Sequence, residues 1–456
     1  MATVLQRTGS GAQYGKMTIS FWVKRSKLGE QGIFGRRQGS ATANLSTCHF
    51  GGDDSLLINF RDGGGTSKYY MITNRKFRDV GAWYHIVFAI DGTNSTAGDR
   101  SKLYINGVRE TSFALLNNPS STGYEVNMFA GGSYNTYIAR GLRSQTDAWL
   151  TFEGCMSHFH CSTGYTYDAD VFGSTDSTTG EWQINTSPTF TPGTDGFTIL
   201  KDGITITDQS ANSNNFTVYS GTLTKTEDNP SNVFATLNNV LGTDVVGSTC
   251  TFSNGNTVAE DPNGSASGIN PNFISTLGMP SKGKWYCELQ PSSFSTSSGH
   301  SIGIYRTKGS TDDTGEGDLE GSAAKIRYIF ADTSIYIIKY GTNDQTGLTA
   351  ITSGQTVGMA LDLDNGTLQY YVNGSTRANA ITGINSANDG FDYFFHAGLE
   401  SSSSGRYGKY SWNFGNGAFG STQLTGTTYQ DSQGRGIFKH QPPTNFLALC
   451  TRNLNV

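Results

Sequence analysis

Hydrophobic and polar residues alternate along most of the chain with the period of two that is typical of β-strands. In MTISFWVKRS, residues 17–26, the apolar residues Ile19, Phe21 and Val23 alternate with Ser20, Trp22 and Lys24. Similar runs recur, each close to Gly, Asp or Asn, in SLLINFRD, KYYMITN, WYHIVFAIDGT, GKWYCELQ and HSIGIYR. With no convincing amphipathic helical stretch and no heptads, this pattern predicts an all-β chain of short antiparallel strands.

Two short sequence segments in the chain are nearly the same. KLYINGVRE contains Asn106–Gly107, and LQYYVNGSTR contains Asn373–Gly374. Asn-Gly tolerates the positive φ angles of a type I′ turn, whose twist matches the flanking strands of a hairpin. A long strand of the form HIVFAID or GMALDLD precedes each hairpin. The repetition therefore predicts two domains of related sandwich architecture, and not one catalytic motif used twice.

Composition agrees with this prediction and narrows the choice of partners. Gly accounts for 58 of 456 residues, about twice ordinary usage, and Thr, Ser, Asn, Tyr and Phe are favoured over helix formers. The net charge of −5 argues against a nucleic-acid partner, because a phosphate-binding protein needs a basic face. We expect no membrane span, since no segment approaches about 18 apolar residues, and no signal peptide. No cofactor is expected.

Changes in composition divide the chain into four segments. Two sandwich domains are expected over residues 1–185 and 250–416. Residues 186–249, rich in Ser, Thr, Asn and Asp, form a β-rich connector, and residues 417–456 form a C-terminal extension. The extension contains NFLALCTRNL, residues 445–454, which is apolar for a chain end. We expect it to dock on its own domain or on a neighbouring subunit.

The six cysteines have no repeated spacing, and we expect all of them to be free thiols. The string CMSHFHC, residues 155–161, has the composition of a metal site. On a regular strand, however, Cys155 and Cys161 face one way with Phe159, whereas His158 and His160 face the other. That geometry argues against a shared zinc ion, and we expect the histidines to point outward.

No catalytic residue is expected. GHSIG, residues 299–303, matches G-x-S-x-G, but that motif needs a strand before the Ser and a helix after it, and IGIYR reads as strand. The carboxylates of EGDLE, residues 316–320, would share one strand face, as a retaining glucanase requires. Gly and further acids flank them, so they are interpreted as a solvated acidic loop. Asp362 and Asp364 precede a turn, where Asp is ordinary.

Two groups of loop residues could bind a ligand. Oxygen ligands suited to calcium are supplied by Asp53, Asp54, Asp91 and Asp99, although turn formation, which is common for Asp, is the favoured interpretation of these residues. A flat apolar ring with a hydroxyl suits a sugar or a protein partner, and a guanidinium can hold a carboxylate bidentately. On this basis the candidate glycan-binding residues are Tyr69, Tyr70, Tyr134, Tyr137, Arg140 and Arg143. The alternative is that the tyrosine rings cap the sandwich, and the sequence does not separate the two.

Several stretches resemble known families. TISFWVKR, WYHIVFAIDGT and LYINGVRE resemble the laminin-G-like, concanavalin-A-like jelly roll over roughly residues 1–185. GKWYCEL, SIGIY and VGMALDLDNGTLQYYVNGS resemble a SPRY-type sandwich over residues 250–416. DQSANSNNFTVYSG, NPSNVFATLN and the ending PPTNFLALCTRNL are similar to a tandem found in virion proteins of tailed phages, especially marine ones.

The resemblance implies a non-enzymatic virion protein assembled in the host cytoplasm, most simply a tail-fibre or surface-appendage subunit that contacts the host through sandwich loops. A capsid decoration protein that stabilises the particle is the alternative, because the chain lacks the long shaft or coiled coil usual in fibres. The expected partners are other virion proteins, further copies of the chain with a trimer as one candidate, and a host surface glycan or protein.

Overall fold

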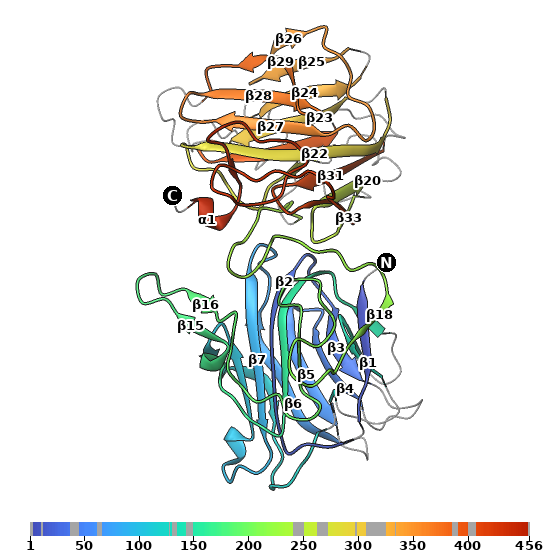
Figure 1. Cartoon of the computed structure of the whole chain (residues 1–456), viewed down its shortest axis with the longest axis vertical. Coiled ribbons are helices and arrows are strands. Elements are labelled where there is room, and N and C mark those ends of the chain that lie inside the picture. The colour runs from blue at the N-terminus through green and yellow to red at the C-terminus, as the bar shows by residue number, and fades with distance from the viewer. Residues whose placement is uncertain are drawn as a thin grey trace. The chain divides into compact units, whose positions relative to one another are not determined.

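The computed structural model of the chain is nearly all β (Figure 1). It describes residues 3–454 except 11, 37–44, 62–65, 127, 130–134, 143–148, 240–249, 262–271, 297–298, 307–324, 333, 385–390 and 400–406. The chain divides into two compact units. The first comprises Met1–Lys225 with Asn229–Ser231, and the second comprises Thr226–Asp228 with Asn232–Val456. Strand residues make most of the core of each unit, which confirms the all-β prediction.

In its described residues the first unit contains two large antiparallel sheets. The eight-stranded sheet has the order β10 (Phe113–Asn117), β6 (Ser67–Lys76), β5 (Ser55–Arg61), β4 (Ser46–Phe50), β3 (Gln31–Arg36), β11 (Asn135–Ile138), β1 (Val4–Thr8), β18 (Thr217–Ser220). The six-stranded sheet has the order β17 (Phe197–Ile199), β14 (Gly154–Thr163), β2 (Lys16–Arg25), β7 (Trp83–Asp91), β8 (Ser101–Ile105), β9 (Val108–Arg109).

Small elements complete the first unit. These are the strand pairs β12 (Arg140–Leu142) with β13 (Trp149–Thr151) and β15 (Gly173–Thr175) with β16 (Trp182–Ile184), and the 3-10 turns η1 (Ala97–Asp99) and η2 (Ala169–Val171).

The core of the first unit lies between the two large sheets. Ile19, Phe21 and Val23 of β2 belong to one buried cluster, as their alternation predicts. Phe21 packs edge-on against Phe34 of β3, with ring centroids 5.9 Å apart, and so joins the two sheets. Residues that alternate along a strand fill the space between sheets, which is how a β-sandwich forms its interior.

The second unit repeats this plan. One sheet has the order β19 (Thr251–Ser253), β20 (Val258–Asp261), β31 (Gly408–Asn413), β22 (Lys284–Phe294), β27 (Val357–Asp362), β28 (Thr367–Val372), β29 (Ser375–Ile381), with β34 (Leu447–Ala448) beside β22. The other has the order β21 (Asn272–Ile274), β30 (Tyr393–Leu399), β23 (His300–Arg306), β24 (Lys325–Ala331), β25 (Tyr336–Lys339), β26 (Thr342–Thr346). The remaining elements are β32 (Ala418–Phe419), β33 (Thr422–Gln423) and α1 (Thr451–Leu454).

The two Asn-Gly turns have the predicted conformation. Asn106 and Gly107 have φ of 47° and 78°, and Asn373 and Gly374 have φ of 49° and 80°. They connect β8 to β9 and β28 to β29, which are antiparallel neighbours. Positive φ at both central positions is the requirement of a type I′ turn, and it explains why Asn-Gly stands at both places.

The structure departs from the expected segment boundaries. Within the expected connector, β17 pairs with β14 and β18 pairs with β1, so residues up to Lys225 belong to the first unit. The C-terminal extension belongs to the second unit, where β34 pairs in parallel with β22 and Leu449 is buried. Docking of the apolar chain end on its own domain is therefore confirmed.

Strand β14 contains a bulge that the regular alternation missed. The register with β2 shifts between Ser157 and His160, and His158 has a positive φ of 48°. The extra residue reverses the alternation, so Cys161 faces the core and Cys155 lies on the opposite face with His160. The expectation that both cysteines face one way was wrong for this reason. All six cysteines are free thiols, as predicted.

Candidate functional site

Two tyrosines and one arginine meet at the edge of the eight-stranded sheet in the first unit. The rings of Tyr137 and Tyr219 lie edge to face, with centroids 5.3 Å apart and an interplanar angle of 75°. The guanidinium carbon of Arg140 lies 4.9 Å from the Tyr137 centroid and 5.0 Å from the Tyr219 centroid. Tyr219 is 49% exposed, so the cluster presents an aromatic surface to solvent.

Strand register brings these residues together from distant parts of the chain. Gln6 of β1 pairs with Tyr137 of β11 on one side and with Thr217 of β18 on the other. Paired residues point to the same face of a sheet, so the three side chains form one row. Ala139 has a positive φ of 62°, which ends β11 and lets Arg140 begin the next strand over the Tyr137 ring.

A polar hollow of about 340 Å³ adjoins this row. Gln6 and Thr217 belong both to the row and to the hollow. All its lining residues carry hydroxyl, amide or guanidinium groups, and they are Gln6, Arg7, Thr8, Ser213, Asn214, Asn215 and Thr217. The hydroxyl and amide groups both donate and accept hydrogen bonds, as sugar hydroxyls do, whereas the guanidinium of Arg7 only donates.

The wall of the hollow is a loop held by charged side chains. Asp208 accepts hydrogen bonds from the backbone N–H groups of Ser210 at 2.8 Å and Asn214 at 2.9 Å, which shapes residues 208–215. Arg7 donates to the side-chain oxygen of Asn214 at 2.8 Å and forms an ion pair with Asp195 at 3.1 Å. The loop is therefore fixed from both sides, and its exposed groups have a defined direction.

Of the predicted glycan-binding residues, the structure brings Tyr137 and Arg140 together. Tyr134 and Arg143 lie outside the described residues. Tyr219 was not singled out from the sequence, because only the pairing of β18 with β1 places it beside Tyr137. The one signal available was an aromatic residue in the short stretch TVYS next to an Asn-rich loop.

Tyr69 and Tyr70 do not join this cluster. Tyr69 is completely buried in the core, where burial raises the pKa of its phenol to about 12, so it cannot stack on a ligand. Its selection as a glycan-binding residue was wrong, because neighbouring strand residues face opposite sides. Tyr70 is half-buried and faces the same side as Tyr137, but β5, β4 and β3 lie between them. Four strand spacings of about 4.8 Å put the two rings roughly 19 Å apart.

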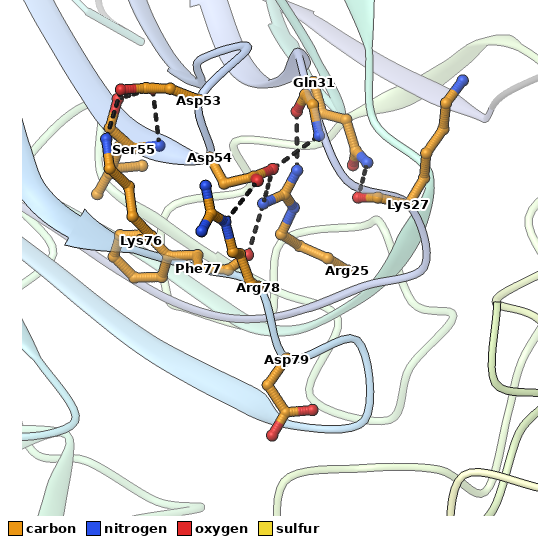
Figure 2. A network of polar contacts seen from close by, with 12 residues as sticks. Arg25, Lys27, Gln31, Asp53, Asp54, Ser55, Lys76, Phe77, Arg78 and Asp79 are labelled. Atoms are coloured by element: carbon orange, nitrogen blue, oxygen red, sulfur yellow. Dashed lines mark hydrogen bonds and ion pairs between the residues drawn. The ribbon is translucent and has the colours of Figure 1, made fainter. Parts of the chain in front are cut away.

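Asp54, a calcium candidate, is the centre of a polar network (Figure 2). Its carboxylate accepts hydrogen bonds from Arg25 at 3.1 Å, from Arg78 at 3.1 Å and from the backbone N–H of Gly29 at 2.7 Å. Burial acts to raise the pKa of Asp54, but these hydrogen bonds and charges lower it overall. The carboxylate therefore balances the buried guanidinium of Arg25, and this role does not need a metal ion.

The other calcium candidates are also paired with basic side chains. Lys76 donates to Asp53 and thereby lowers the pKa of that carboxyl. Lys16 lies 3.2 Å from Asp91, and Arg109 lies 2.8 Å from Asp99. In the part of the chain that the structure describes, no three His, Cys, Asp or Glu side chains lie close enough together to hold a metal ion.

The residues considered for catalysis have roles in the fold, as far as they lie within the described residues. Ser301 is inside strand β23, as expected, and not on a strand-to-helix turn. Asp362 pairs with Lys284 and accepts from the backbone N–H of Asn365 at 2.9 Å, while Asp364 accepts from that of Gly283 at 2.8 Å. The acidic string 316–320 lies outside the described residues.

Among the described helices, none is long and apolar enough to span a membrane.

Comparison with known proteins supports the assignment of the first unit. Residues 6–149 match a laminin-G family model described as the concanavalin A-like lectin/glucanases superfamily. This match confirms the laminin-G-like resemblance for that part of the chain. No curated protein matches the sequence.

Three solved structures show partial similarity. The SPRY domain of human HERC1 is 16% identical, covering 39% of this chain and 94% of its own, with a TM-score of 0.28. The TRIM65 PSpry domain is 14% identical, with coverages of 39% and 91% and a TM-score of 0.28. A heptameric SAP-like pentraxin from Limulus polyphemus is 14% identical, with coverages of 36% and 71% and a TM-score of 0.26.

Proposed function

We propose that the first unit binds carbohydrate at the edge of its eight-stranded sheet, through Tyr137, Tyr219 and the adjoining polar hollow. The observation that carries the proposal is the exposed Tyr219 ring beside Tyr137, with Arg140 over both. A sugar ring has an apolar face of C–H groups and a rim of hydroxyls, so it needs an aromatic surface next to polar side chains. The family description of residues 6–149, which includes lectins, is consistent with this role.

Each residue of the proposed site contributes a different kind of contact with the sugar. Tyr219 offers the ring on which a sugar stacks, and Tyr137 supports it from the side. Gln6 and Thr217 stand at the junction with the hollow, where they can bind the hydroxyls of the same or the next sugar. Arg140 holds both rings by cation–π contact, and a guanidinium here also suits an acidic sugar.

A glycan array probed with the full chain tests the proposal. We expect binding by the parent and a loss of about tenfold in affinity for Tyr219→Ala, because removing a stacked ring costs roughly 1–1.5 kcal/mol. Tyr219→Phe should retain binding. Tyr165→Ala is the matched control, since Tyr165 is 45% exposed and lies outside the cluster. No binding by the parent, or equal binding by Tyr219→Ala, would refute the proposal.

We further propose that the chain works as a tail-fibre or appendage subunit of a tailed-phage virion. The support is the order of sequence motifs, from TISFWVKR to PPTNFLALCTRNL, which is similar to that of such virion proteins. Immunogold labelling of purified particles with an antibody against the chain tests this setting. Label on the tail is expected, label over the capsid would favour a decoration protein, and unlabelled particles would contradict both roles.

A further inference from the structure

The outer face of the six-stranded sheet carries a group of three buried histidines. His85 lies on β7, and His158 and His160 lie on or beside the bulge of β14. The segment 165–190 covers this face, with Phe172 and Phe190 packed on the His160 ring at 5.6 Å and 5.5 Å. This cluster belongs to a different sheet from the proposed carbohydrate site, and its chemistry does not depend on that proposal.

The β15–β16 hairpin is attached to this face through one aromatic side chain. The indole N–H of Trp182 donates to Nδ1 of His85 at 3.0 Å, and the two rings are nearly parallel, 5.9 Å apart. Trp22 stacks on the His85 ring at 4.7 Å. Between Ser174 and Glu181 the residues are exposed except for the half-buried Asp176, so Trp182 is the main anchor of the hairpin.

The donor and acceptor roles fix the protonation state of His85. An indole N–H can only donate, so Nδ1 of His85 must accept and carries no proton. The proton of the neutral ring is then on Nε2, which lies 2.9 Å from the Ser20 hydroxyl and donates to it. A second proton on His85 could only go to Nδ1, where it would face the indole N–H and break the hydrogen bond.

The surroundings also oppose a charge on His85. Burial, followed by the nearby His158, lowers the pKa of His85 to about 3. The ionisable groups on the surrounding elements include His158, His160, Lys24, Tyr104, Arg109, Asp168, Asp170, Lys201 and Asp202, and the hairpin itself carries Asp176 and Glu181. Asp168 and Asp170 act on Tyr104, and Asp202 acts on His158. No carboxylate is among the groups that act on His85.

We propose that the Trp182–His85 hydrogen bond is an acid-sensitive latch, which holds the β15–β16 hairpin on the sheet at neutral pH and releases it when His85 takes up a second proton. Release of the hairpin exposes the His85 ring to water. The affinity of the ring for protons then returns toward that of an ordinary histidine. Linkage then makes the opening equilibrium tenfold more favourable for each pH unit below about 6.5. A two-stranded hairpin is marginal by itself, so the released segment loses its internal hydrogen bonds as well.

Hydrogen exchange of the full chain between pH 7.5 and 5, corrected for the intrinsic pH dependence of exchange, tests the latch. Protection of residues 173–185 should fall about tenfold per pH unit below 6.5, while that of β2 and β7 stays high. His85→Asn puts a non-titrating acceptor near the Nδ1 position, and the pH dependence should disappear. Trp182→Phe keeps a ring but removes the donor, and the hairpin should already exchange rapidly at pH 7.5.

His158→Asn is the matched control, because it removes a neighbouring histidine that does not contact Trp182 through any hydrogen bond in the described structure. The tenfold slope should survive in this variant. Constant protection of residues 173–185 in the parent, or an unchanged slope in His85→Asn, would overturn the latch. Should His85→Asn fail to fold, the parent slope and Trp182→Phe still decide the question.

Discussion

The side-chain oxygen of Asn106 accepts a hydrogen bond from the backbone N–H of His85 at 2.8 Å. Asn373 does the same in the second unit, where its partner is the N–H of Thr356 at 3.0 Å. In both cases the backbone N–H of the Asn also donates to the carbonyl of the same partner. The repeated Asn-Gly segment therefore encodes, once in each unit, a hairpin turn whose Asn is hydrogen-bonded to the start of the preceding strand. We call this pair of hydrogen bonds the clamp.

Replacing either Asn by Ala should destabilise its own unit by about 1–3 kcal/mol, because a backbone N–H loses its acceptor and Ala tolerates positive φ poorly. Calorimetry of the full chain, which should show a lowered transition for the affected unit, measures this. Asn→Asp at the same positions keeps both the acceptor and the tolerance of positive φ, so it should cost less. Ala variants that melt like the parent would show that the clamp is not stabilising.

Asp54→Ala should be among the most damaging substitutions in the first unit. The side chain of Arg25 is 0% exposed, and Asp54 is its only carboxylate partner within the described residues. Loss of that partner leaves a buried positive charge, at a cost of about 3–5 kcal/mol in unfolding free energy. Denaturant unfolding of the first unit measures the loss.

Asp53→Ala is the control for this substitution. Its partner Lys76 is partly exposed, and the Asp53 side chain is largely so, which limits the expected cost to about 1 kcal/mol or less. Equal costs for the two neighbouring aspartates would contradict the assignment of Asp54 as the counter-ion of Arg25.

The stability of the first unit should decrease in mild acid. Burial lowers the pKa of His85 to about 3 and that of His158 to about 4, and it also lowers the pKa of His160. The unfolded chain, with histidine pKa values near 6.5, binds more protons between pH 6.5 and 4, so stability falls as pH falls through this window. Each histidine contributes a slope of up to about 1.4 kcal/mol per pH unit.

Urea unfolding at pH 7.5, 6.5 and 5.5 measures this slope. His160→Gln should reduce it, since one of the three groups no longer titrates. A stability that is constant or increases between pH 6.5 and 5.5 would be incompatible with three neutral buried histidines.

Local rules predicted the features of this fold that depend on neighbouring residues. Alternation placed Ile19, Phe21 and Val23 inside, and Asn-Gly gave the two turns. The same rules could not reveal the bulge at His158. A bulge leaves no mark in the residue types of its own strand, and it becomes visible only in the register with the neighbouring strand. Nor could these rules choose between Tyr69 and Tyr70, since alternation says that two neighbours face opposite sides but not which side is buried.

The candidate site was predictable only in part for a related reason. Tyr137 and Arg140 are close in sequence, and that proximity suggested a cluster. Tyr219 joins them because β1 pairs with β11 on one side and, on the other, with β18, which lies more than two hundred residues further along the chain than β1. The burial of Asp54 likewise depends on Arg25 of another strand, so from the sequence it resembled an ordinary turn residue.

Glu288 of β22 should control the attachment of the C-terminal segment. It is 0% exposed, and its carboxylate accepts from the backbone N–H groups of Lys439 at 2.8 Å and His440 at 2.7 Å and from the side-chain amide of Asn413 at 3.0 Å. Burial raises the pKa of Glu288 to about 7, so at pH 8 the carboxylate is ionised and all its partners are donors. Glu288→Gln replaces one oxygen by an NH2 group that must face a donor, which should cost about 1–3 kcal/mol at that pH.

Hydrogen exchange at pH 8 locates the effect of Glu288→Gln. The amides of Lys439 and His440 should exchange faster in the variant, because each donates to the replaced group. Glu260→Gln is the control, since Glu260 forms a half-exposed ion pair with Lys409 and its removal should leave those amides unchanged. Unchanged protection of residues 437–440 in Glu288→Gln would mean that β34 and the buried Leu449 hold the segment without help from this carboxylate.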